Sequence, residues 1–396
     1  MNTRDVYVVS ASRTAIGTFG GALKDVSLCA LATTAVNAAL HQGQIEPALV
    51  GHVVMGNVIP TEPQDAYLSR VAAINAGIPK ETPAYNVNRL CGSGLQAIIS
   101  AAQTLLLGEA EVVIGGGAES MSRGPYMLGS ARWGARMGDM QAVDYMLGAL
   151  HDPFHGIHMG ITAENIAERN GISREMQDAL AMEEQGRARR AIAEGRFVDQ
   201  IAPVQTVTRQ GTQLFDVDEH PRTTTLEQLG QMKSAFKPGG SVTAGNASGL
   251  NDGAAALVMA SLAAVKSHNL RPLARLVSYA HVGVDPELMG LGPIPATRLA
   301  LKRAGLTVKH MDVIEANSAF AAQACAVSQE LDLDPVKVNP NGSGIALGHP
   351  VGATGAIIAT KAIHELHRVG GRYALATMCI GGGQGIAVIF ERVEGF

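Results

Sequence analysis

The segment AYNVNRLCGSGLQA occupies residues 84–97 and holds three local signals in succession. Residues 84–88 have strand character, residues 91–94 form a glycine-rich turn, and a helical pattern continues over residues 95–107. The apolar run 112–115 then supplies another strand. Strands of this continuous apolar kind, joined by a helix, are typical of a parallel sheet that is covered on both faces.

The same order of signals occurs before and after this segment. Upstream, a Val-rich run over residues 5–10 precedes a helical Ala/Leu pattern over 28–40 and a strand-like run over 52–58. In the closing third, a helical pattern over 352–367 leads into a strand over 373–378. Repeated βαβ signals of this kind predict an α/β fold.

Two details indicate that the halves are copies of one unit. Residues 86–88 (Asn-Val-Asn) and 337–339 (Lys-Val-Asn) each precede a glycine-rich stretch, and the glycine triplets 115–117 and 381–383 each follow a strand. A duplicated unit predicts two similar domains packed face to face.

Between the copies, from about residue 120 to residue 246, the composition shifts towards Arg, Glu, Asp, His and Met, with charged helical faces such as 175–194. This region is too long for a structureless loop. We expect an N-terminal core (1–119 plus 247–270), an inserted loop subdomain (120–246) over a site made by the two cores, and a C-terminal core (271–396).

The composition bounds the class of protein. With 396 residues, 46% of them hydrophobic and 17% charged, the chain has apolar material for two or three cores, and disorder is excluded. A net charge of -4 with scattered basic residues excludes the footprint of a nucleic-acid binder. No apolar run reaches the roughly 20 residues of a membrane span, and no targeting signal is recognised. We expect a soluble cytoplasmic protein.

The cysteines and histidines favour chemistry other than metal binding. The four cysteines, at positions 29, 91, 325 and 379, have no CxxC spacing, so neither a disulfide scaffold nor a zinc site is expected. The histidine-containing run 151–159 lacks a supporting carboxylate or cysteine pattern. We predict no metal.

Cys91 is a candidate nucleophile because it lies where a strand ends and a helix begins. The positive end of a helix and nearby backbone N–H groups favour a thiolate there. The alternative is a small residue that fills a tight turn. His349 lies between Gly348 and Pro350, just ahead of a helix, where a general base would have a fixed ring position. Cys379 lies at a strand end. Each has a plain structural explanation alone, but a duplicated fold would bring them to one crevice.

Five longer segments resemble the thiolase family, and the resemblance extends over nearly the whole chain. They are NRLCGSGLQA (88–97), GGGAESMS (115–122), TAGNASGLNDGAAA (243–256), NPNGSGIALGHPVGATG (339–355) and CIGGGQG (379–385). The resemblance is closest to acetyl-CoA acetyltransferases and β-ketothiolases. It implies a duplicated thiolase fold with αβαβα layers, an inserted subdomain that binds coenzyme A, and reactions of acetyl-CoA, acetoacetyl-CoA and CoA without a metal or organic cofactor. Family members are usually homotetramers.

The resemblance also implies roles for individual residues. Cys91 would carry the acyl group, His349 would take the proton of Cys91, and Cys379 would move the α-proton of the second acetyl-CoA. Asn317 with His349 would form one oxyanion site, and the backbone N–H groups of Cys91 and Gly381 the other. Seven residues would bind the substrate: His158, Met159, Arg222, Phe236, Ser248, Met289 and Phe320. For Met289 and Phe320, core packing is an equal alternative.

One position departs from the family pattern. Where these thiolases usually read Asn-Glu-Ala-Phe, residues 317–320 read Asn-Ser-Ala-Phe, so that Ser318 replaces a carboxylate. The change could alter hydrogen bonding, the pKa of the cysteines or the rate.

Two other functions remain open at this point. A decarboxylating ketoacyl synthase shares the duplicated fold but has no second cysteine such as Cys379. A catalytically silent acyl-CoA-binding protein is made more credible by Ser318. Nucleotide hydrolysis, dinucleotide binding, zinc proteolysis and serine hydrolysis are excluded, because the P-loop, Rossmann, HExxH and GxSxG patterns are missing.

Overall fold

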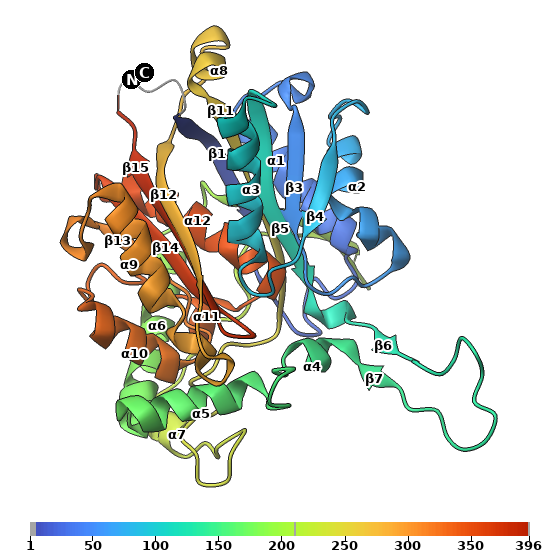
Figure 1. Cartoon of the computed structure of the whole chain (residues 1–396), viewed down its shortest axis with the longest axis vertical. Coiled ribbons are helices and arrows are strands. Elements are labelled where there is room, and N and C mark those ends of the chain that lie inside the picture. Colours follow the sequence, from blue (N-terminus) through green and yellow to red (C-terminus); the bar gives the residue numbers. More distant parts are fainter. Residues whose placement is uncertain (1–4, 210, 395–396) are drawn as a thin grey trace.

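The computed structural model describes residues 5–209 and 211–394, and most of its strands form one continuous mixed sheet, while two hairpins of the inserted segment form small separate sheets (Figure 1). The path across it is β13-β14-β15-β12-β1-β11-β5-β3-β4. The two halves of this path meet where β1 pairs with β12 through Tyr7 with Arg275 and Val8 with Ala274. This short seam separates an N-terminal half from a C-terminal half.

Both halves have the same pairing pattern, which confirms the predicted duplication. Counted outward from the seam, the first three strands of each half pair antiparallel to one another, and the fourth strand is parallel to the third. The fourth strand then makes one more parallel pairing at the outer edge, with β4 in the N-terminal half and through the isolated bridge at Val338 in the C-terminal half. The N-terminal strands are β1 (Val6–Thr14), β11 (Asn251–Ser261), β5 (Val112–Ser120), β3 (His52–Gly56) and β4 (Ala84–Val87). The C-terminal strands are β12 (Ala274–Gly283), β15 (Gln384–Arg392), β14 (Tyr373–Ile380) and β13 (Val313–Ala316).

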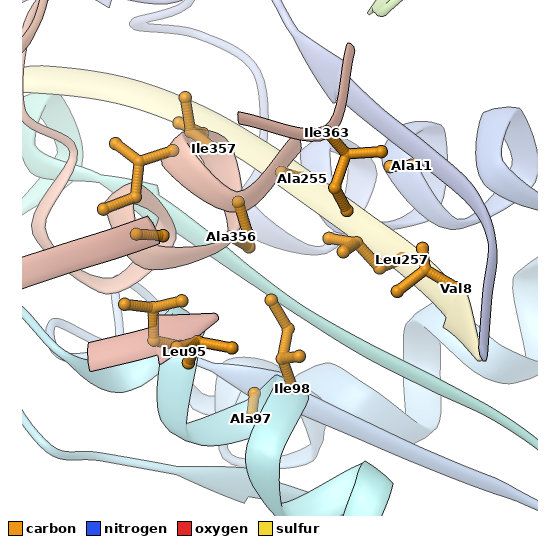
Figure 2. Close-up of a cluster of buried hydrophobic side chains, with 14 of the residues drawn as sticks. Val8, Ala11, Leu95, Ala97, Ile98, Ala255, Leu257, Ala356, Ile357 and Ile363 are labelled. Carbon is orange, nitrogen blue, oxygen red and sulfur yellow. The ribbon is translucent and has the colours of Figure 1, made fainter. Parts of the chain in front are cut away.

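Helices complete the layers on both sides of each half-sheet. The helices α3 (Ser93–Leu107) and α12 (Val351–Arg368) lie between the half-sheets, and their apolar side chains meet those of both halves (Figure 2). The outer helices are α1 (Leu28–Gln42) and α2 (Leu68–Asn75) on the N-terminal half, and α9 (Pro293–Ala304) and α10 (Ala321–Leu331) on the C-terminal half. The order of layers is therefore αβαβα, as the resemblance implied.

Successive side chains of a strand point to opposite faces of the sheet, so each strand contributes to a central core and to an outer core. On β1, Val8 faces the central helices, whereas Val9 packs against α1 on the outer side. Val8 is fully buried and Val9 is nearly so, because helices cover both faces of the sheet. This explains why the strands contain continuous apolar runs, such as residues 6–9 of β1 and 112–114 of β5.

The inserted segment combines helices with short strands. Its hairpin β6/β7 projects from the body in Figure 1, and its helices α5 and α6 pack against α10. The elements are β6 (Tyr126–Met127), β7 (Val143–Asp144), α4 (Tyr145–Ala149), α5 (Met159–Asn170), α6 (Arg174–Ala193), β8 (Ile201–Ala202), β9 (Val204–Thr208), β10 (Gly211–Phe215) and α7 (Leu226–Gly230). The remaining short elements are β2 (Gly17–Thr18), α8 (Leu262–Ser267) and α11 (Gly344–Leu347).

Several predicted boundaries were wrong. The triplet 115–117 does not follow a strand but lies inside β5. Glycine is needed at position 117 because a Cβ there would come within 2.4 Å of the carbonyl oxygen of Gly352. Likewise β14 continues through Cys379 to Ile380. Residues 337–339, which correspond to the end of β4 in the other half, form only an isolated bridge from Val338 to Ile314.

Within the described part of the chain, one helical segment, Leu90–Leu107, is long and apolar enough to cross a membrane. It is mostly buried between the two half-sheets as α3, which accounts for its apolar composition.

Candidate active site

The predicted reactive residues meet in one cavity of about 330 Å³ between the two halves and the inserted segment. Cys91 comes from the turn before α3, His349 from the turn before α12, and Cys379 from the end of β14. The duplication explains this convergence, because α3 and α12 are corresponding helices that cross in the central layer.

Cys91 lies in a strained turn. Leu90, directly before it, has a φ of 46°, in the left-handed region that costs a residue with a Cβ roughly 1–2 kcal/mol. The carboxamide oxygen of Asn88 accepts a hydrogen bond from the Leu90 N–H at 2.9 Å and supports this conformation. A Cβ on Gly92 would come within 2.4 Å of the Ile380 side chain, so the turn also needs glycine for space.

The environment of Cys91 favours the neutral thiol. Burial raises its pKa, the backbone N–H groups of Gly381 and of Cys91 itself lower it, and the buried Glu119 carboxylate raises it. Burial has the largest effect, so the expectation that the helix end favours a resting thiolate is wrong. Cys91 therefore needs a base to remove its proton.

His349 is a neutral base held in one tautomer. Burial lowers its pKa to about 4. Its Nδ1 lies 2.7 Å from the Thr354 hydroxyl, and that hydroxyl donates to the carbonyl oxygen of Pro350 at 2.8 Å. Since the hydroxyl hydrogen is used there, Nδ1–H must donate to it. Nε2 is then unprotonated and can accept the proton of Cys91.

Cys379 is a buried thiol close to Cys91. Burial raises its pKa strongly, and the charge of a Cys91 thiolate would raise it further. A thiol with this property holds its proton at rest and becomes a strong base once the proton is lost.

Two of the four predicted oxyanion donors, Asn317 and Gly381, are not among the residues that line the cavity. Gly381 nevertheless presents its N–H to the Cys91 sulfur. Asn317 directly follows β13 and is buried, and neither its amide nitrogen nor its amide oxygen has a hydrogen-bond partner among the described residues. An uncommitted buried amide of this kind can serve a substrate oxygen directly or through water.

All seven predicted substrate-binding residues line the cavity. His158, Met159, Arg222, Phe236, Ser248, Met289 and Phe320 are found there. The ring of Phe236 stacks on the ring of His158, with 4.6 Å between the ring centroids. It also makes an edge-to-face contact with Phe320, with 6.1 Å between the ring centroids. His158 also caps α5, since its Nδ1 accepts the N–H of Gly160 at 3.0 Å.

The sequence interpretation missed most of the apolar wall. Besides four alanines, the missed hydrophobic side chains that line the cavity are Met121, Leu147, Leu150, Leu250 and Val351. No local signal identifies them, because single Met and Leu residues pack in cores throughout the chain. The sequence interpretation also missed two residues that position His349. Thr354 contacts the imidazole ring, and the side-chain oxygen of Asn251 accepts the backbone N–H of His349 at 2.9 Å.

The other two histidines of the run 151–159 make local contacts. His155 Nδ1 lies 2.9 Å from the Asp152 carboxylate, and His151 meets His158 edge to face. Within residues 5–209 and 211–394, no three His, Cys, Asp or Glu side chains cluster in a way that could hold a metal ion.

Family models agree with this architecture over almost the whole chain. The thiolase N-terminal domain matches residues 6–263, and the thiolase C-terminal domain matches residues 270–392.

Individual proteins are similar over their full length. The beta-ketothiolase BktB of Cupriavidus necator is 64% identical, over 99% of this chain and 100% of its own. The crystal structure of human mitochondrial 3-ketoacyl-CoA thiolase in complex with CoA has a TM-score of 0.96 at 48% identity, over 99% of this chain and 98% of that one. The Bacillus anthracis acetyl-CoA acetyltransferase has a TM-score of 0.96 at 47% identity, over 98% and 99% of the two chains. The chain belongs to the thiolase family.

Proposed function

We propose that this thiolase condenses two acetyl-CoA molecules to acetoacetyl-CoA and CoA, and cleaves 3-ketoacyl-CoA with CoA in the reverse direction. The observation that carries the proposal is the convergence of Cys91, His349 and Cys379 on one cavity, with the Gly381 N–H at the Cys91 sulfur. An acyl-cysteine intermediate links the two half-reactions.

In the first half-reaction, His349 Nε2 takes the proton of Cys91, and the thiolate attacks the thioester carbon. The C–S bond to CoA breaks, and Cys379 gives its proton to the departing CoA sulfur. The raised pKa of Cys379 means that the residue begins as a thiol with a proton available for transfer, and that the resulting thiolate is a strong base for the next half-reaction. The products are free CoA, an acetyl group on Cys91 and a Cys379 thiolate.

In the second half-reaction, the Cys379 thiolate takes the α-proton of another acetyl-CoA. The resulting carbanion attacks the acetyl carbon on Cys91, and the C–S bond to Cys91 breaks. His349 returns its proton to Cys91, so every group regains its starting state. Enolate charge would be held by Asn317 with His349, and tetrahedral oxyanion charge by the N–H groups of Cys91 and Gly381.

The cavity wall supports a short acyl substrate that is not restricted to acetyl. Met121, Met289 and Phe320 present apolar surface near the cysteines. The family resemblance supports Ser248 and His158 for binding the pantetheine arm and Arg222 for binding the adenine end. Phe236 stacks on His158 and contacts Phe320, so it would lie beside the pantetheine arm. No metal or organic cofactor enters these steps.

We further propose a cytoplasmic homotetramer. The projecting β6/β7 hairpin supports assembly, because its exposed apolar side chains include Trp133 at 88% and Met137 at 95% exposure. Apolar surface of this kind is typical of contacts between subunits.

The test is thiolysis of acetoacetyl-CoA with free CoA, followed by the loss of enolate absorbance. We expect turnover by the parent and none by Cys91→Ala, which removes the sulfur that carries the acyl group. Cys325→Ala is the control, because Cys325 lies on α10 outside the cavity. Both variants should keep the parent's thermal unfolding midpoint.

Three outcomes would contradict the proposal. Unchanged absorbance with a folded parent would indicate a silent acyl-CoA binder. Decarboxylation of malonyl-CoA with no thiolysis would indicate a ketoacyl synthase. Retained turnover in Cys91→Ala would remove Cys91 from the mechanism.

A further inference from the structure

Ser318, which stands where the family usually has Glu, contacts a carboxylate from another part of the chain. Its hydroxyl donates to Oε2 of Glu184 at 2.7 Å. Ser318 is fully buried and Glu184 is 1% exposed. Glu184 belongs to α6 of the inserted segment, so the carboxylate reaches this place from outside the motif that contains Asn317.

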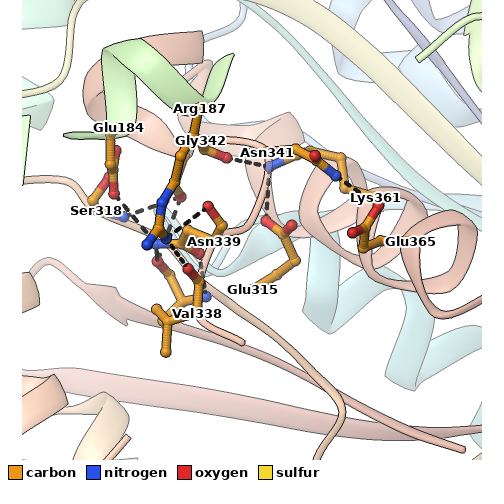
Figure 3. Close-up of polar contacts among 12 residues, drawn as sticks. Glu184, Arg187, Glu315, Ser318, Val338, Asn339, Asn341, Gly342, Lys361 and Glu365 are labelled. Carbon is orange, nitrogen blue, oxygen red and sulfur yellow. Dashed lines mark hydrogen bonds and ion pairs between the residues drawn. The ribbon is translucent and has the colours of Figure 1, made fainter. Parts of the chain in front are cut away.

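Glu184 binds several segments around the active site at once (Figure 3). Besides the Ser318 hydroxyl, its carboxylate accepts from the side-chain amide of Asn339 at 3.3 Å and from the Ser343 N–H. The Ser318 oxygen in turn accepts the Ile345 N–H at 3.2 Å, at the start of α11. These contacts fix both the strand end that carries Asn317 and the loop that leads to His349.

The donors around Glu184 require a carboxylate. Each of its two oxygens accepts a hydrogen bond, Oε2 from Ser318 and Oε1 from Asn339. A carboxamide at this position would turn an NH2 group towards one of these donors. Burial raises the pKa of Glu184 to about 7, and its hydrogen bonds together with the Lys361 charge oppose that shift. Lys361 is itself buried and paired with Glu315 at 2.7 Å.

We propose that Glu184 supplies, from α6, the carboxylate that other thiolases carry at position 318, and that the Glu184–Ser318 pair positions Asn317 and the loop before His349. The inference rests on the proposed thiolase activity. Glu184 is a positioning residue, because it contacts neither of the cysteines and does not line the cavity. Ser318 is then the hydroxyl partner of that carboxylate and not a defect of the site.

The experiment compares two single variants with the exchanged double variant. We expect Glu184→Gln and Ser318→Ala to lower kcat for acetoacetyl-CoA thiolysis by roughly tenfold or more with little change in KM, because misplaced groups cost rate more than binding. The double variant with Glu184→Ser and Ser318→Glu should return kcat to within about threefold of the parent, as one carboxylate again faces one hydroxyl.

Two controls separate positioning from loss of folded protein. Glu183→Gln alters the neighbouring carboxylate on α6, which is 54% exposed and pairs with Arg187, and should leave kcat unchanged. Active sites are counted from the mass of acetylated Cys91, so kcat refers to competent sites only. If Glu184→Gln fails to fold, the exchanged variant still decides the question.

The outcomes distinguish the two proposals. A parent that folds but does not cleave acetoacetyl-CoA overturns the proposed function, and the positioning role with it. An active parent whose kcat per site is unchanged in Glu184→Gln overturns the positioning role alone. An exchanged variant that folds but stays tenfold below the parent also overturns it.

Discussion

The pKa values of the reactive residues are set by burial. Burial lowers the pKa of His349 to about 4 and raises those of Cys91 and Cys379. The resting site therefore contains neutral groups, which cost less free energy to bury than an ion pair.

The lowered pKa of His349 predicts a pH dependence of stability. Between pH 6.5 and 4 the unfolded chain binds a proton at this histidine and the folded chain does not, so stability is lost as the pH falls through this window. The loss in unfolding free energy over this window is about 3 kcal/mol, since the pKa falls from 6.5 to about 4 and each pKa unit corresponds to about 1.36 kcal/mol.

Urea unfolding of the parent and of His349→Asn at pH 4.5, 5.5 and 6.5 would measure this contribution. We expect the unfolding free energy of the parent to decrease more than that of His349→Asn as the pH falls. His268→Asn, at the exposed end of α8, controls for the loss of a histidine as such. A parallel pH profile for His349→Asn and the parent would contradict the prediction.

At the scale of elements, α3 and α12 cross with their backbones in contact. A Cβ on Gly94 would lie 2.5 Å from the Ala356 nitrogen, and a Cβ on Gly355 would lie 2.3 Å from the Leu95 nitrogen. Both neighbours are backbone atoms of packed helices, so they cannot move aside cheaply. This close crossing brings Cys91 and His349, each just before one of the helices, to the same cavity.

Gly94→Ala is therefore expected to destabilise the fold by about 1–3 kcal/mol or more, the usual cost of overpacking. It should also lower turnover per folded molecule, because the two helix starts are forced apart. Gly186→Ala on α6 is the matched control. No described atom lies within 4 Å of a Cβ there, so the variant should gain about 0.5–1 kcal/mol. Urea unfolding and thiolysis rates would show both effects, and equal stabilities of the two variants would refute the argument.

At the scale of the whole molecule, a buried ion pair attaches the inserted segment to the N-terminal half. Arg13 of β1 binds both carboxylate oxygens of Asp218 at 2.7 and 2.9 Å, and both side chains are fully buried. Asp218 also accepts the Ile16 N–H at 2.9 Å, and the Arg13 guanidinium lies over the Phe197 ring. The segment that follows Asp218 contains Arg222, at the cavity.

Asp218→Asn is expected to destabilise the protein by about 3 kcal/mol, because it leaves the Arg13 charge buried without a countercharge. The KM for CoA should rise more than kcat falls, since the change loosens the substrate-binding segment and leaves the cysteines in place. Asp25→Asn, in the exposed pair with Lys24, is the control and should change stability by less than about 0.5 kcal/mol. A stability of Asp218→Asn equal to that of the control would contradict this role.

Much of the architecture could be predicted because its signals are local. The strand, turn and helix around Cys91 follow one another within a few residues, and the second copy repeats the glycine-rich turn and the helix around His349. The glycine triplet 115–117 was misread for the same reason. Glycine in sequence indicates a turn, but here it admits the backbone of a helix against a strand, and that contact involves Gly352 from the other half.

The sequence alone was enough to predict the duplicated α/β unit and the family resemblance, and to select Cys91, His349 and Cys379 as candidate catalytic residues, since each depends on short patterns or on motif identity. Only the tertiary structure decided that Cys91 rests as a thiol, that His349 carries its proton on Nδ1, and that Glu184 faces Ser318. Each of these depends on burial or on a hydrogen-bond partner supplied by chain packing. Such properties arise when distant segments exclude water together, and no local pattern of residues encodes them.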